Sequence, residues 1–148
     1  MSANVEDTII SNSPDETRQI ASSFVSLLVR GDVIALTGEL GAGKTQFVQG
    51  LAKGLGFQGT VSSPTFTLIH EYTGGKLPLF HADFFRLDSL ADALQIGIED
   101  YLCADGVTAI EWAEKFPSLL PDNCFHVSLE CLEEHRRRIV FGIPQTRK

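Results

Sequence analysis

Residues 38–45 read GELGAGKT and match the pattern G-x-x-x-x-G-K-[ST] at every specified position. The glycines permit backbone conformations that turn successive N–H groups toward phosphate oxygens. Lys44 can reach the β- and γ-phosphates of a nucleotide, and the hydroxyl of Thr45 can ligate Mg²⁺. The spacing therefore predicts a site for a nucleoside triphosphate and Mg²⁺, but it does not say how the nucleotide is used.

Such a loop needs an acidic partner for the metal and for the attacking water, and the sequence offers two. Asp83 ends the segment LFHAD, and Glu111 follows the apolar run VTAI. Ligands of open α/β sheets bind at the carboxyl ends of the strands, which makes Glu111 the cleaner candidate. Either side chain could instead be a solvated carboxylate at a strand end, an alternative that is stronger for Asp83. Which of the two ligates Mg²⁺ directly stays open.

Three further features near these residues have weaker signals. Residues 62–65 read SSPT, a hydroxyl-rich loop that can place a hydroxyl near the γ-phosphate or Mg²⁺, or can be a turn fixed by Pro64. Trp112 is the sole tryptophan and adjoins Glu111, so it lies either beside the site or in the core. We interpret the basic run 136–138 as the solvated end of a hairpin.

The elements that must position these residues follow from hydrophobic spacing. A buried strand over 33–36 enters the glycine loop, and an amphipathic helix over 47–55 leaves it. SPDE at 13–16 is a helix start, with serine as cap and Gly31 suited to the helix end. The pattern also predicts strands over 65–72, 77–81, 107–110, 125–131 and 139–143, with short helices over 88–96 and 99–103.

Composition limits the classes of function. The 148 residues fit one domain, 1–148, and 43% hydrophobic and 21% charged residues are ordinary values for a globular protein. The net charge of −7, from 12 basic and 19 acidic residues, disfavours a protein that grips nucleic acid alone. We expect a cytoplasmic protein, because the N-terminus lacks a signal-like pattern and the three cysteines form no CxxC pair.

Four segments, in this order along the chain, resemble segments of a known protein family. GELGAGKTQFVQGLAKGLG, SSPTFTLIHEY, HADFFRL and IEWAEK resemble the TsaE family, the small ATPases of the bacterial system that makes threonylcarbamoyladenosine in tRNA. The likeness covers nearly the whole chain. It implies a single α/β P-loop NTPase domain, with a mainly parallel central sheet flanked by helices and antiparallel strands added.

The resemblance also implies an activity and partners. It implies weak, Mg²⁺-dependent ATP hydrolysis that supports turnover of a complex with TsaD and TsaB rather than the transfer chemistry itself. That complex modifies adenosine 37 of tRNAs reading ANN codons, so tRNA is a partner only indirectly. No membrane partner is implied.

The residues that match the family's functional positions can be named. Lys44, Asp83 and Glu111 match catalytic positions, and Thr45, Asp83 and Glu111 match metal positions. The nucleotide-contacting positions that we expect are Glu39, Gly41, Ala42, Gly43, Lys44, Thr45, Thr65 and Trp112. The adenine contacts cannot be assigned from the sequence.

Other uses of the same loop remain alternatives. A small-molecule kinase commonly has a lid bearing arginines, and no insertion long enough for one is visible. A GTPase switch would carry an NKxD base-reading motif, which is missing. A nucleotide-binding scaffold that never hydrolyses is disfavoured by the two carboxylates.

Overall fold

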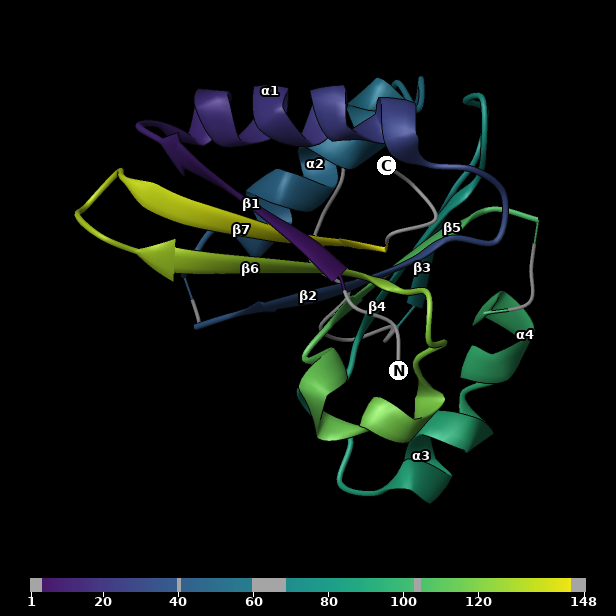
Figure 1. Cartoon of the computed structure of the whole chain (residues 1–148). Coiled ribbons are helices and arrows are strands. Elements are labelled where there is room, and N and C mark those ends of the chain that lie inside the picture. The colour runs from purple at the N-terminus through teal and green to yellow at the C-terminus, as the bar shows by residue number, and fades with distance from the viewer. Residues whose placement is uncertain (1–3, 40, 60–68, 103–104, 145–148) are drawn as a thin grey trace.

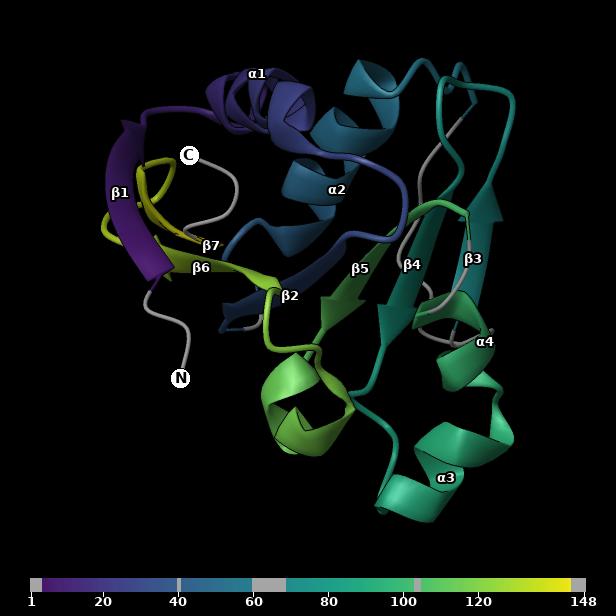
Figure 2. The same cartoon turned by 45° about the vertical axis from the view of Figure 1, so that its right-hand side comes forward.

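The structure is a computed structural model that describes residues 4–39, 41–59, 69–102 and 105–144. Its seven-stranded sheet has the order β1-β7-β6-β2-β5-β4-β3 (Figures 1 and 2). The strands are β1 (Asn4–Ser11), β2 (Val33–Gly38), β3 (Ile69–Tyr72), β4 (Leu79–Asp83), β5 (Val107–Glu111), β6 (Phe125–Cys131) and β7 (Arg137–Pro144). The helices are α1 (Pro14–Phe24), α2 (Lys44–Gly54), α3 (Leu90–Gln95) and α4 (Ile98–Leu102), with 3₁₀ turns η1 (Val25–Leu27), η2 (Ala113–Lys115) and η3 (Pro117–Leu119).

The centre of the sheet is parallel, as predicted. Strand β2 pairs in parallel with β5 and β6, and β5 pairs in parallel with β4. Strands β3, β7 and β1 add antiparallel pairs at the two sides. The α/β fold class with a mixed, mainly parallel centre is therefore confirmed.

The sheet is covered on both faces. Helices α1 and α2 lie over one face, while α3, α4, η2 and η3 lie on the other side (Figures 1 and 2). The position of β2 in the sheet explains why its sequence is continuously apolar. Ile34 and Leu36 belong to the cluster under α1 and α2, whereas Val33 and Ala35 belong to the cluster on the opposite face. A strand buried on both faces has no polar side to alternate with.

Helix α1 starts where the sequence predicted. The hydroxyl of Ser13 accepts a hydrogen bond from the Glu16 N–H at 3.1 Å, and Pro14 occupies the first helical position. The predicted end was wrong. The α-helix stops at Phe24 and η1 follows, while Gly31, with φ of 88°, donates its N–H to the Gly106 carbonyl at 2.8 Å. Gly31 therefore serves the entry to β2 rather than the helix end.

Helix α2 packs closely against α1 because it carries a glycine where the two helices meet. A Cβ at Gly50 would lie 2.3 Å from the Arg18 carbonyl oxygen and 2.7 Å from the Ala21 Cβ. This contact fixes the middle of α1 relative to α2, the helix that leaves the glycine loop.

Strand β1 was not predicted, because its side chains do not alternate cleanly. It pairs with β7 along its whole length, from Asn4 opposite Pro144 to Ser11 opposite Arg137. The predicted hairpins are present as β3–β4 and β6–β7. Of the strand predicted over 65–72, the structure shows 69–72, and the rest lies outside the described residues.

Within the described residues, no helix is long and apolar enough to span a membrane. Cys124 is a buried free thiol and Cys131 an exposed one, while Cys103 lies outside the described residues.

Candidate functional site

Three neighbouring strands end at one place in the fold. The glycine loop follows β2, Asp83 ends β4, and Glu111 ends β5. Glu111 is in register with Leu36 on one side and with Asp83 on the other. The carboxyl ends of these parallel strands therefore bring the loop and both carboxylates to the same edge of the sheet.

A cavity with a volume of about 430 Å³ opens there. Its size is within the range of small-molecule sites. Its lining consists of Pro14, Gly41, Gly43, Lys44, Thr45, Gln46, Asp83, Phe85, Arg86, Glu111, Trp112 and Arg137.

The loop has the backbone that its glycines were predicted to supply. Gly41 and Gly43 adopt φ values of 82° and 99°, in the left-handed region that other residues avoid. Gly43 is the residue that caps the start of α2, so the positive end of the helix dipole faces the cavity. This combination of turned amides and helix start is the arrangement that binds phosphate.

The ammonium group of Lys44 is held at the mouth of the loop. It donates to the Gly38 carbonyl oxygen at 2.8 Å and lies 4.2 Å from the centroid of the Trp112 ring. The whole residue is 5% exposed. Both contacts suit a cation, one through a carbonyl dipole and the other through the face of an aromatic ring.

Trp112 reaches Lys44 from a strained backbone. Its φ of 59° and ψ of 33° are left-handed, and no other non-glycine residue in the described ranges has a positive φ. A bulky residue in this region is a true outlier. The turn ends β5 directly after Glu111, and the Trp112 ring also packs on Phe85, with 5.1 Å between centroids. Strain of this kind gathers at functional sites.

The two carboxylates have different surroundings. Asp83 is 8% exposed and accepts a hydrogen bond from the Phe85 N–H at 2.9 Å. Burial, with a smaller contribution from the charge of Glu111, raises the pKa of Asp83 above its ordinary value, although the Phe85 bond opposes the shift. Glu111 is 5% exposed, and its Oε2 lies 2.5 Å from Nε2 of His81.

Arg137 belongs to the site although it lies on the β6–β7 hairpin. Its Nε donates to the Ala42 carbonyl at 3.1 Å and its Nη2 to the Gly41 carbonyl at 3.3 Å. Its Nη1 donates to carbonyls of the β6–β7 turn, including that of Glu133 at 2.9 Å. The guanidinium therefore ties the turn to the glycine loop. Our interpretation of the basic run 136–138 as a solvated hairpin end was therefore wrong for Arg137.

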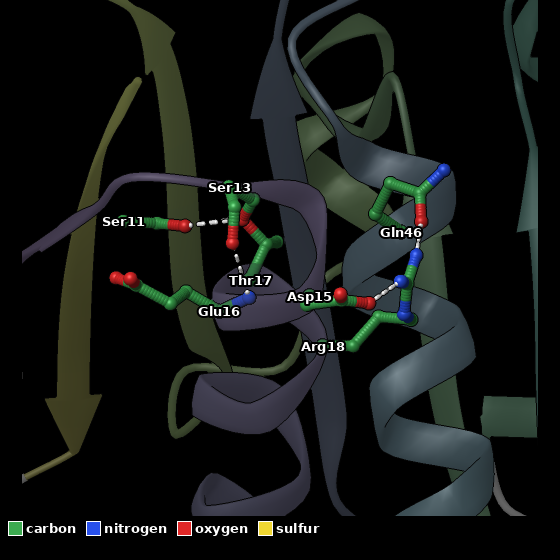
Figure 3. A network of polar contacts seen from close by, with 7 residues as sticks. All are labelled: Ser11, Ser13, Asp15, Glu16, Thr17, Arg18 and Gln46. Carbon is green, nitrogen blue, oxygen red and sulfur yellow. Dashed lines mark hydrogen bonds and ion pairs between the residues drawn. The ribbon is translucent and has the colours of Figure 1, made fainter. Parts of the chain in front are cut away.

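The start of α1 is also tied to the site. Arg18 on α1 donates to the Gln46 side chain on α2 and pairs with Asp15 (Figure 3). The Ser11 hydroxyl bonds to the Ser13 carbonyl at 2.8 Å and to the Thr17 hydroxyl at 2.7 Å. Because Gln46 lines the cavity, this network fixes one wall of it.

Comparison with known proteins decides the family. A family model described as "Threonylcarbamoyl adenosine biosynthesis protein TsaE" matches residues 11–139. The chain belongs to the TsaE family. A relative from Bacillus subtilis is 40% identical over 128 residues, covering 86% of this chain and 80% of the relative. One from Treponema pallidum is 43% identical over 130 residues, covering 88% and 96%. Both are named tRNA threonylcarbamoyladenosine biosynthesis protein TsaE.

A solved structure of the same kind shares the fold. The crystal structure of Bacillus subtilis YdiB superposes with a TM-score of 0.84 at 33% sequence identity, covering 99% of this chain and 91% of that one. The resemblance to the TsaE family that the four sequence segments carried is confirmed.

The predicted site residues of this TsaE-family chain are only partly brought together. The cavity is lined by Gly41, Gly43, Lys44, Thr45, Asp83, Glu111 and Trp112. Glu39 is exposed, and its carbonyl accepts the Ala42 N–H at 3.0 Å, which closes the turn of the loop. Ala42 is buried, and Thr65 lies outside the described residues.

Sequence reasoning missed Arg137, Gln46, Phe85 and His81. Only His81 had a usable signal, since it lies two residues before Asp83 on the same strand and so shares its face.

The donors present fit a magnesium ion. Mg²⁺ is usually held by one or two carboxylates, a hydroxyl and the phosphates of the nucleotide, with water completing the shell. Asp83, Glu111 and the half-buried Thr45 line one cavity beside a phosphate-binding loop. Oxygen donors alone are present in this set, which suits a hard cation.

Proposed function

We propose that this chain binds ATP and Mg²⁺ in the cavity, hydrolyses ATP slowly, and serves a complex with TsaD and TsaB in the cytoplasm. In this proposal the complex threonylcarbamoylates adenosine 37 of tRNAs reading ANN codons, and hydrolysis supports its turnover. The observation that carries the proposal is the convergence of the phosphate loop with Asp83 and Glu111 at the ends of β2, β4 and β5. Membership of the TsaE family supports the place in tRNA modification.

Each residue has a role that follows from its position. The loop amides and Lys44 bind the phosphates, and Lys44 exchanges its Gly38 carbonyl for a phosphate oxygen. Thr45 together with Asp83, Glu111 or both would hold the metal, which would supply positive charge against the phosphates. Glu111 also orients the attacking water, because it is the carboxylate at the central strand of the three. Trp112 packs over Lys44 and restricts water around it.

The test is an ATPase measurement with and without TsaD and TsaB. We expect slow hydrolysis by the chain alone and stimulation by the two proteins. Glu111→Gln should reduce the rate by about 10²–10³-fold while ATP binding persists, as expected for a group that acts mainly in the transition state. Lys44→Ala should abolish nucleotide binding.

Matched controls lie close to these residues in the sequence or on the same helix. Glu114→Gln changes an exposed carboxylate three residues beyond Glu111, and Lys53→Ala changes an exposed lysine at the far end of α2. Both should behave as wild type. Efficient phosphorylation of a nucleoside or another small acceptor without TsaD and TsaB would favour the kinase instead. Threonylcarbamoyladenosine formation followed over several turnovers then tests the biological role, and no dependence on this chain would contradict it.

A further inference from the structure

Among the described histidines, His81 alone is buried and contacts a carboxylate of the candidate site, that of Glu111. It is 0% exposed and lies on β4 two residues before Asp83, so both side chains are on the face that α2 covers. Opposite His81 on β5 is Ala109, and Glu111 follows two residues later. The small Ala109 leaves room for the imidazole to reach diagonally across the strand pair to Glu111.

The contact and the burial of the ring favour one tautomer of His81. Nε2 of His81 lies 2.5 Å from Oε2 of Glu111. With an ionised carboxylate, which only accepts hydrogen bonds, Nε2 is the donor in this contact. Nδ1 is fully buried and finds no hydrogen-bond partner in the described part of the chain. A bare nitrogen is the less costly state for such an atom, because a buried N–H without an acceptor forgoes a stronger hydrogen bond.

Packing alone does not account for a histidine here. The neighbouring β4 side chain on the same face, Leu79, is apolar and fully buried. An apolar residue at position 81 would fill similar space without burying an unpartnered polar atom, which is unfavourable. The feature that an apolar residue cannot provide is the hydrogen bond to Glu111.

We propose that His81 is a positioning residue for Glu111. By donating from Nε2 to Oε2, it fixes the rotamer of the carboxylate and leaves Oε1 as the oxygen available to the cavity, where it meets the metal or the water. The proposal rests on the proposed function in so far as Glu111 acts in hydrolysis. Partners of this kind orient the groups that touch a metal and typically change activity by about 10- to 100-fold when removed.

Two amide variants separate positioning from packing. The side-chain nitrogen of Gln in His81→Gln reaches the place of Nε2, whereas that of Asn in His81→Asn reaches only the place of Nδ1. We expect His81→Asn to lower the single-turnover hydrolysis rate about 10- to 100-fold, with ATP affinity within about threefold of wild type. His81→Gln should keep most of the rate. In a Glu111→Gln background, His81→Asn should cost no more than about twofold, since the two residues act as one unit.

Two readouts do not depend on hydrolysis. The ¹⁵N spectrum of the imidazole should show Nδ1 unprotonated and Nε2 protonated. Crystal structures should show the Glu111 rotamer kept in His81→Gln and changed in His81→Asn. Equal losses in both variants, full additivity with Glu111→Gln, or a proton on Nδ1 alone would overturn the proposal. If wild type hydrolyses no ATP even with TsaD and TsaB, the proposed function fails, while the spectrum and the Glu111 rotamers still decide the role of His81.

Discussion

Asp83 and Glu111 lie opposite each other at the ends of adjacent parallel strands, both nearly buried. For Asp83, burial and the nearby charge of Glu111 both disfavour the charged form, which destabilises the protein without a cation. The raised pKa of Asp83 reports this cost. A bound cation relieves the repulsion, which is why the same pair suits a metal-dependent site.

The substitution Asp83→Asn should therefore stabilise the free protein at neutral pH. Asn keeps an oxygen to accept the Phe85 N–H and removes the charge. We expect a higher Tm at pH 7, by about 2–4 °C for each kcal/mol gained in a chain of this size, and reduced ATP hydrolysis. Thermal unfolding of the free wild-type protein and of Asp83→Asn measures this difference in Tm. Asp105→Asn, which alters an exposed carboxylate, is the control and should change little.

The pH dependence of that gain has a definite sign. The pKa of folded Asp83 lies above its ordinary value of 3.8, so the folded state binds the proton more tightly than the unfolded state. The free energy of unfolding therefore rises as pH falls through the raised pKa. The advantage of Asp83→Asn should be full above the raised pKa and vanish below pH 3.8, where both states are protonated. An advantage that grows as pH falls would contradict the assignment.

At the scale of elements, the β6–β7 hairpin contributes Arg137 to the lining of the proposed nucleotide site. Arg137 connects the hairpin turn to the carbonyls of Gly41 and Ala42. Its neighbour Arg138 points elsewhere and pairs with Glu130, both of them exposed. Adjacent residues on a strand face opposite sides of the sheet, so only one of the two arginines can reach the loop.

Arg137→Ala should weaken nucleotide binding, because the glycine loop loses the bonds that hold its carbonyls. We expect ATP affinity to fall by about 5- to 30-fold, the equivalent of about 1–2 kcal/mol. Arg138→Ala is the matched control and should bind within about twofold of wild type, since exposed ion pairs contribute little. Calorimetric titration with ATP and Mg²⁺ compares the two. Equal affinities would show that the hairpin does not support the loop.

The elements that were predicted from the sequence have local apolar patterns, whereas the element that was missed depends on a partner far away in the chain. Strand β2, helix α2 and strand β5 have periodic or continuous apolar patterns, and they were predicted because a local pattern reports local structure. Strand β1 has no such pattern and exists because β7 offers it a long edge to pair with. The role of Arg137 was missed for the same reason, since its partners in the glycine loop, Ala42 and Gly41, are 95 and 96 residues away in the chain.

At the scale of the whole molecule, charge decides how tRNA can be involved. The net charge of −7 opposes contact with a polyanion, and the basic run at 136–138 is partly used within the fold. We expect the isolated chain to leave tRNA unshifted in a gel at about 150 mM salt. The complex with TsaD and TsaB serves as the positive control. Saturable, salt-sensitive binding of tRNA by the chain alone would contradict an indirect role.

The sequence by itself determined the phosphate loop, the strand and helix on either side of it, and the two carboxylates at strand ends. These are encoded by residue types at short spacing, so local backbone chemistry is enough to read them. Only the tertiary structure decided that Arg137 braces the loop, that Trp112 covers Lys44 and that His81 bonds to Glu111. Those contacts depend on strand order and register, which place residues far apart in the chain within hydrogen-bonding distance.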